Sequence, residues 1–293
     1  MTTNGDTQDR YILQRNYHAS ARLNLQTYLW RDSLGYIIHP SVPPLKADAR
    51  VADVGYHGAK LFPAVRNTTD RIWLTQLNRE LNRDSVRLDG FDIDISQCPR
   101  QEWMPSNIHF QQWDAVQPPP AELHGQFDLV HLRLVMIGIA NEDLAKVVAN
   151  LALLLKPGGY LQWEEINNFD NHVVTINDTI QTPAMSELLE WMTAGPKKYR
   201  NGVEWRLIIP TVLEQHGFTN AVVHSHSDPP ELRRWLTEVS FQTLTEFAGK
   251  KLPKDSKEAI WLSRILEQAH EECKNGAAIH MGKLICVAQK KEI

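Results

Sequence analysis

The chain has 293 residues, of which 42% are hydrophobic and 23% are charged, and its formal net charge at pH 7 is −4. This acidic balance argues against a nucleic-acid-binding surface, which usually needs a basic patch, and no run of Lys and Arg indicates an anionic membrane partner. No stretch approaches the roughly 18 apolar residues that a membrane span needs, and the polar N-terminus has no signal-peptide core. We therefore expect a cytoplasmic protein that binds neither nucleic acid nor membranes.

The cysteines and histidines predict no metal site. Cys98, Cys273 and Cys286 are odd in number and far apart, which favours a reducing compartment over a disulfide framework or a zinc site. His224 and His226 would share one face of a strand, but no third ligand lies at a convincing spacing. We therefore predict that the protein binds no metal ion.

In chain order, the first expected element is a helix over residues 10–33, followed by a proline-rich loop that ends at Pro44. Short β-rich runs then alternate with amphipathic helices, which is typical of βαβ units and a parallel sheet. The clearest helix begins at Asn141, carries one apolar face, and is expected to stop at residues 157–159. The expected strands cover residues 49–54, 85–92, 108–113, 127–132, 159–163, 221–224 and 283–288.

Three more helices are expected late in the chain, at residues 184–193, 230–248 and 256–274. Helices of this kind can cover the open end of a doubly wound sheet, where ligands bind. We therefore expect three parts in the chain. They are an N-terminal helical lid (1–45), a ligand-binding core (46–166), and a part with helical substrate-lid elements and the last two strands (167–293).

Two aspartates follow neighbouring strands at the edge where a ligand is expected. Asp92 ends the second strand, and its carboxylate could accept hydrogen bonds from two ribose hydroxyls. Asp114 follows the third strand and could accept a hydrogen bond from an adenine amino group, with Trp113 or Ile93 as an apolar wall. Either aspartate could instead cap or begin a turn.

An ordered set of motifs covers most of the chain and resembles the fungal class I S-adenosylmethionine (SAM) methyltransferases of secondary metabolism. That group includes gliotoxin-type enzymes and related regulatory methyltransferases. The resemblance implies a doubly wound α/β fold with a seven-stranded, mostly parallel sheet whose last strand is antiparallel. It also implies SAM as the cofactor and a small natural product as the acceptor. The motifs are residues 21–26, Leu34–Tyr36, Val51–Gly55, Leu88–Ile93, Trp113–Asp114, Phe127–Arg133 and Leu155–Glu165.

The resemblance implies a role for residues at each strand end. Gly55 would lie beneath the methionine part of SAM, Asp92 at the ribose and Asp114 at the adenine. Arg133 would lie near the sulfonium or the substrate. The other residues expected around the cofactor are Tyr56, Ile93, Trp113 and Ala115.

The glycine-rich SAM loop of this family is interrupted in the present sequence. Relatives follow the first strand with a short glycine-rich turn, because a Cβ would collide with the cofactor there. Here residues 57–70 intervene, and Arg71 stands where a glycine is expected. The insertion could loop out while SAM is still bound, could fill the SAM pocket, or could be an artefact of the gene model.

Three residues are candidate bases for methyl transfer, which otherwise needs little more than alignment of the nucleophile with the methyl group. They are His131, Glu164 and His172. His131 could instead be packed against the sheet, and His172 could be an ordinary loop residue. The pair Glu164–Glu165 could hold one carboxylate over the pocket and the other in solvent.

These observations predict a SAM-dependent methyltransferase that modifies O, N or S of a small natural product, and that forms a possible homodimer. Because the glycine-rich loop is interrupted, a second hypothesis is a pseudo-methyltransferase that isomerises or cyclises a biosynthetic intermediate. A third hypothesis is a non-catalytic partner that regulates a related enzyme.

Overall fold

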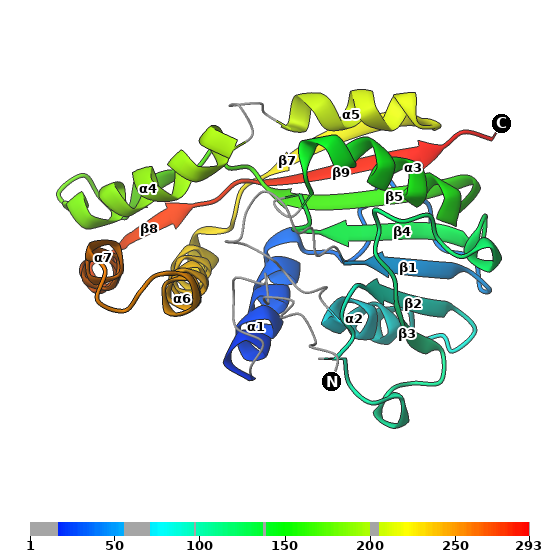
Figure 1. The fold of residues 1–293 in the computed structure, drawn as a ribbon, viewed down its shortest axis with the longest axis horizontal. Helices are drawn as coiled ribbons and strands as arrows, with labels where there is room; N and C mark the ends of the chain where they lie inside the picture. The colour runs from blue at the N-terminus through cyan, green and yellow to red at the C-terminus, as the bar shows by residue number, and fades with distance from the viewer. Residues whose placement is uncertain (1–16, 56–70, 97, 137–138, 200–204, 293) are drawn as a thin grey trace, which may run out of the picture.

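A seven-stranded sheet forms the centre of the computed structural model, which describes residues 17–55, 71–96, 98–136, 139–199 and 205–292 (Figure 1). The five strands from β3 to β5 run parallel to one another, whereas β9 runs antiparallel to both of its neighbours. This arrangement confirms the predicted doubly wound, mostly parallel sheet with an antiparallel last strand. In order across the sheet the strands are β3 (Ile108–Gln112), β2 (Arg87–Asp92), β1 (Arg50–Val54), β4 (Phe127–Arg133), β5 (Leu155–Ile166), β9 (Lys283–Lys290) and β7 (Phe218–His226).

Helices cover both faces of the sheet. On one face Trp30 of α1 and Trp73 of α2 join a buried core with apolar side chains of β1, β2 and β4. On the other face, Val147 of α3 and Leu213 of α5 belong to a second core beneath β4 and β5. The helices are α1 (Tyr17–Leu34), α2 (Arg71–Leu81), α3 (Leu144–Leu154), α4 (Pro183–Tyr199), α5 (Trp205–Gln215), α6 (Arg233–Lys251) and α7 (Lys257–Lys274).

A third apolar cluster lies beyond the carboxyl end of β5, at the left of Figure 1. It is formed by α4, α6 and α7 together with a second, two-stranded sheet of β6 (His172–Thr175) and β8 (Ala277–His280). Leu29 of α1 joins this cluster, so the N-terminal helix contacts both the central sheet and the late helices. In the described part of the chain, no helix is both long enough and apolar enough to cross a membrane.

Three details differ from the sequence prediction. β5 begins at Leu155, so residues 157–159 lie inside a strand, and its register against β4 shifts there. Gly158 has a φ of +74°, which glycine adopts without strain, so the segment forms an irregularity within β5. The sequence does not predict α5, which contains Pro210, because proline normally interrupts a helix. It also does not predict β6 and β8, which are four residues long each.

Gly90 in β2 is required by the aromatic ring on the neighbouring strand. A Cβ added to Gly90 would lie 2.5 Å from Phe110 Cδ1, closer than packed atoms approach. We expect Gly90→Ala to lower the free energy of unfolding by about 1–3 kcal/mol, because overpacking forces side chains and backbone to shift. Urea denaturation measures this loss. In the Phe110→Leu background the same substitution should cost less, and an equal cost in both backgrounds would contradict the proposed clash.

Candidate cofactor site and buried charge network

The carboxyl ends of β1 and β2 border a small, shallow hollow that is open to solvent. Ligands of doubly wound sheets bind at this edge, near the point where the strand order reverses, which here lies between β1 and β4. The hollow is lined mainly by Asp53, Phe91, Asp92, Ile95, Cys98 and Phe110.

Both predicted nucleoside-binding aspartates begin turns at this edge. The Asp92 Oδ1 accepts a hydrogen bond from the Asp94 backbone N–H at 2.9 Å, and the Asp114 Oδ1 accepts one from the Val116 N–H at 3.0 Å. The Trp113 N–H donates to the Asp92 carbonyl at 2.9 Å, which holds the ends of β2 and β3 together. A carboxylate has several acceptor sites, so a role in a turn is compatible with a role in ligand binding.

The other residues expected around the cofactor also follow strand ends. Gly55 is buried directly after β1, and its N–H donates to the Phe91 carbonyl at 2.8 Å. Ile93 follows β2 and is half-buried, whereas Ala115 after β3 is fully buried. The buried ring of Trp113 packs edge-to-face on Phe91, with 5.8 Å between the ring centroids.

Two features of the predicted SAM loop lie outside the described residues. They are Tyr56 and the insertion over residues 57–70. The three alternatives for that insertion therefore stay open. The helix expected after it is α2, which begins at Arg71.

A buried charge network, formed by Asp53, His131, Arg133 and Glu164, lies on the face of the sheet that α1 and α2 cover. The sheet register brings these residues together, because Asp53 is paired with His131 across β1 and β4, and Arg133 with Glu164 across β4 and β5. The His131 Nδ1 lies 2.7 Å from Asp53 Oδ1, and its Nε2 lies 3.4 Å from Glu164 Oε1. The Arg133 Nε donates to Glu164 Oε2 at 2.8 Å. Trp73 of α2 stacks on the His131 ring at a centroid distance of 3.9 Å.

The charges of this network support one another despite complete burial. Burial opposes ionisation of Glu164, but the Arg133 guanidinium and the His131 ring outweigh it and hold the pKa of Glu164 far below its usual range. Burial also opposes a charge on His131, but Asp53 and Glu164 outweigh this effect and raise its pKa. An imidazole with a raised pKa, placed between two carboxylates, holds a proton firmly. This arrangement favours a positioning role for His131 over proton abstraction from a substrate.

Gln162 connects the network to the segment that follows α1. Its side-chain amide donates to Glu164 Oε1 at 2.6 Å and to the Ile37 carbonyl at 3.0 Å. Its carbonyl oxygen accepts a hydrogen bond from the His39 N–H at 2.8 Å. Because Gln162 is fully buried, these bonds fix residues 37–39 against the carboxyl half of β5.

Trp30 of α1 lies between two cations at the end of the network. The guanidinium carbon of Arg133 lies 5.4 Å from the indole ring centre, and the Lys283 Nζ lies 4.9 Å from it. Lys283 also pairs with Asp228 and donates to the Ser33 hydroxyl at 3.1 Å. The buried end of α1 is therefore held by cation–π contacts and hydrogen bonds from β4 and β9.

The expectation that one carboxylate of the pair Glu164–Glu165 lies in solvent is wrong. Glu164 is fully buried, and Glu165 is only 4% exposed. The Glu165 Oε1 accepts hydrogen bonds from the Met136 N–H at 2.7 Å and the Trp163 indole N–H at 2.9 Å. Neighbouring strand residues point to opposite faces, and both faces of this sheet are covered, so both carboxylates are enclosed and satisfied.

The structure separates the three candidate bases. His131 and Glu164 share the buried charge network, whereas His172 is exposed and lies on β6, paired with His280 of β8. Asp53, Trp73 and Gln162 also belong to this region, and the sequence alone predicts no role for them. Asp53 could have been predicted because it lies next to the last residue of a predicted strand. Trp73 and Gln162 look like ordinary core positions in the sequence, and only the strand register shows what they contact.

The sequence of the chain is similar to those of known methyltransferases. No protein-family model matches the chain. The chain is 30% identical to the methyltransferase grgD of a Penicillium species over 164 residues, which cover 54% of this chain and 52% of that protein. It is 28% identical to the N-methyltransferase verN of Clonostachys rogersoniana over 215 residues, covering 73% and 67% of the two chains. In sequence the chain is therefore similar to fungal methyltransferases of secondary metabolism.

A solved methyltransferase structure shares the fold of the chain. The SAM complex of Haemonchus contortus phosphoethanolamine N-methyltransferase 2 matches with a TM-score of 0.50 and 15% sequence identity. That match covers 95% of the present chain and 58% of the other. At this identity the likeness establishes the fold alone. The chain spans about half the length of grgD.

Proposed function

We propose that the chain is a SAM-dependent methyltransferase that transfers a methyl group to O, N or S of a small natural product. The observation that carries the proposal is the hollow beside Asp92, at the edge of the sheet where doubly wound folds bind their ligands. The names of the relatives support the reaction class, and verN is named as an N-methyltransferase, so nitrogen acceptors are the first to test.

In this proposal the nucleoside of SAM binds across the ends of β2 and β3. Asp92, which borders the hollow, accepts hydrogen bonds from the ribose. Asp114 accepts from the adenine amino group beside Trp113, and Ile93 and Ala115 complete the apolar surroundings. Gly55, buried directly after β1, faces the methionine part.

The buried charge network would hold the reacting end of the site in place. Arg133 ends β4 close to the expected position of the sulfonium, and its guanidinium is fixed by Glu164 and Trp30. His131 and Glu164 then act as positioning residues, because neither is exposed to a substrate. Methyl transfer depends chiefly on alignment of nucleophile and methyl group. Side chains that are rigidly held beneath the site can therefore contribute to the rate without transferring a proton.

The late helices and α1 would enclose the acceptor. Their shared apolar cluster supports the proposed division into an N-terminal lid (1–45), a SAM-binding core (46–166) and a part with the substrate lid (167–293). The cytoplasmic location and the homodimer stay predictions.

Calorimetric titration with SAM, and with its demethylated product S-adenosylhomocysteine, tests the proposal. We expect saturable binding of both, and transfer of the labelled methyl group of SAM to an acceptor among small fungal metabolites. Absence of binding at millimolar SAM would overturn it. Turnover of a metabolite without SAM and without mass gain would favour the isomerase or cyclase alternative.

A further inference from the structure

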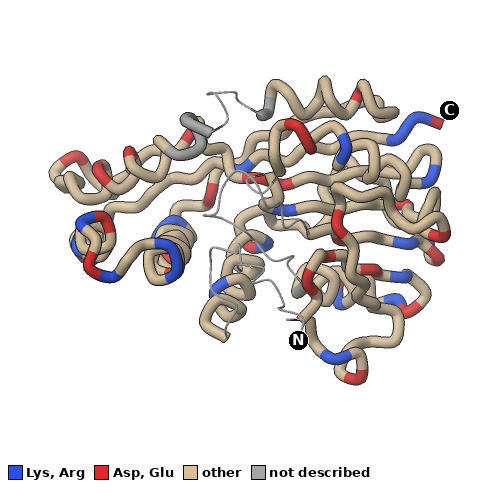
Figure 2. The backbone as a smooth tube through the Cα atoms, in the orientation of Figure 1, with Lys and Arg blue, Asp and Glu red and all other residues tan. Residues whose placement is uncertain are grey.

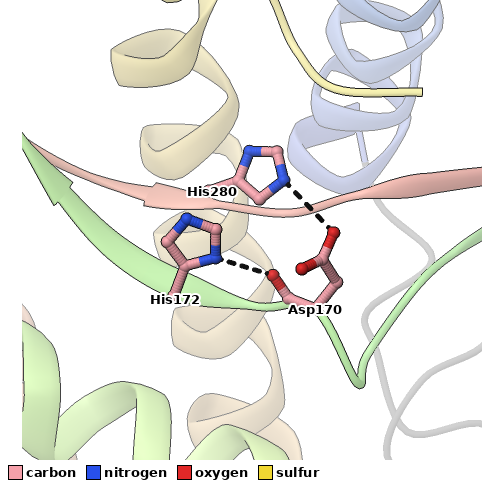
Figure 3. Close-up of side chains that lie close together, drawn as sticks. All are labelled: Asp170, His172 and His280. Carbon is pink, nitrogen blue, oxygen red and sulfur yellow. Dashed lines mark hydrogen bonds and ion pairs between the residues drawn. The ribbon is translucent and has the colours of Figure 1, made fainter. Parts of the chain in front are cut away.

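Two histidines and an aspartate from distant parts of the sequence converge where β6 and β8 form their two-stranded sheet (Figure 3). His172 of β6 is directly paired with His280 of β8, and Asp170 precedes β6 by two residues. One nitrogen of each ring and one carboxylate oxygen all lie within 4.8 Å of one another. This group lies outside the buried charge network and outside the hollow at Asp92.

The spacing of these atoms is close to that of a metal centre. The His280 Nε2 lies 3.7 Å from Asp170 Oδ2. Ligands bonded at about 2.0–2.1 Å to a tetrahedral Zn²⁺ lie roughly 3.3 Å apart, so small side-chain rotations would close the site. Gly282 leaves room for the carboxylate, because a Cβ at that position would lie 3.0 Å from Asp170 Oδ2.

The chemistry of the group also suits a transition-metal ion. Neutral imidazole and carboxylate are ligands that Zn²⁺ accepts, and three protein ligands leave a position for water. The His172 ring is held beside the carboxylate by a 2.9 Å hydrogen bond between its Nδ1 and the Asp170 carbonyl.

We propose that Asp170, His172 and His280 bind a divalent transition-metal ion, with Zn²⁺ as the fitting example. Asp170 and His172 are exposed, whereas His280 is buried, so the ion would have protein on one side and water on the other. Such an ion would tie the segment after β5 to the strand that leads into β9. It would therefore fasten the late helices to the central sheet.

The test uses the full chain, stripped with chelator and titrated with Zn²⁺ by calorimetry. We expect one Zn²⁺ per chain and a rise in the thermal unfolding midpoint. His172→Ala and Asp170→Asn should each weaken Zn²⁺ binding at least tenfold, because the first removes the ligand nitrogen and the second replaces the charged carboxylate by a neutral amide. Both positions are exposed, where the fold tolerates change. Co²⁺ should give visible d–d absorption in the wild type that both variants lose.

His224→Ala is the matched control. His224 also lies on a strand and also has a second imidazole beside it, since its ring centroid is 4.2 Å from that of His39, against 4.7 Å between His172 and His280. We expect this variant to bind Zn²⁺ like the wild type. No Zn²⁺ binding by the wild type, or unchanged binding by both His172→Ala and Asp170→Asn, would overturn the proposal. Loss of binding in His224→Ala alone would assign the ion to the other histidine pair and would also overturn it.

Discussion

Arg133→Met is expected to lower the free energy of unfolding by about 3–5 kcal/mol, because it leaves the Glu164 carboxylate buried without its main counter-charge. Methionine keeps much of the volume of the arginine stem, so the effect reports the lost charge more than a cavity. The guanidinium also contributes a hydrogen bond of 2.8 Å to Glu164 and a contact with the Trp30 ring. Urea denaturation followed by circular dichroism measures the loss.

The matched control is Arg234→Met, because Arg234 pairs with Glu238 at 2.9 Å on an exposed face of α6. Exposed pairs are screened by water, so this variant should unfold close to the wild-type midpoint. The double variant Arg133→Met with Glu164→Gln should be less destabilised than the sum of the two single variants, since it removes the unpaired buried charge. A loss for Arg133→Met as small as that of Arg234→Met would refute the network as a source of stability.

The stability difference between the wild type and Arg133→Met depends on pH, and its direction follows from the lowered pKa of Glu164. Its pKa is lowered in the folded state, so the resulting stabilisation is present above the ordinary glutamate pKa of about 4.3 and declines as the pH falls below it. The difference between wild type and Arg133→Met should therefore shrink as the pH falls from about 5 towards 3. His131 acts in the opposite sense, because its raised pKa stabilises the fold at low pH and this contribution is lost as the pH rises through the folded-state value.

The central sheet could be predicted because its signals are local. Each predicted strand coincides with a strand of the structure, since β-rich runs of this length between amphipathic helices permit few alternatives. The segments that the sequence predicts wrongly, or does not predict, depend on which strands lie beside them. The turn at residues 157–159 lies within β5 because pairing with β4 continues around it, and β6 exists because β8 pairs with it after a hundred intervening residues.

Only the residues of the candidate site that lie at strand ends could be predicted from the sequence. Asp92 and Asp114 could be predicted because Asp92 ends one strand and Asp114 follows the next, and the structure brings those strand ends together. The contacts of His131 could not be read from the sequence, because they depend on which residues of β1 and β5 lie opposite it. The same limit applies to His280, whose neighbour His172 is distant in sequence. A search for closely spaced ligands therefore predicts no metal site.

Asp92→Asn is expected to weaken SAM binding by about 10- to 100-fold if the proposed cofactor site is correct. Asparagine can still accept the 2.9 Å hydrogen bond from the Asp94 N–H, so the turn after β2 should persist. It loses the negative charge and one acceptor oxygen, and a hydrogen bond to a charged group contributes about 1.5–3 kcal/mol. Each 1.4 kcal/mol corresponds to about a tenfold change in affinity. Calorimetric titration with SAM measures the effect.

The control for this result is Asp128→Asn, which makes the same change at the amino end of β4, far from the ligand-binding edge. Asp128 pairs with Lys156 at 2.6 Å and does not line the hollow, so its replacement should leave SAM affinity unchanged. If Asp92→Asn folds normally and binds SAM as tightly as the wild type, the ribose does not lie at Asp92. The nucleoside would then have to bind at another part of the sheet edge, and the roles proposed for Asp114 and Trp113 would fail with it.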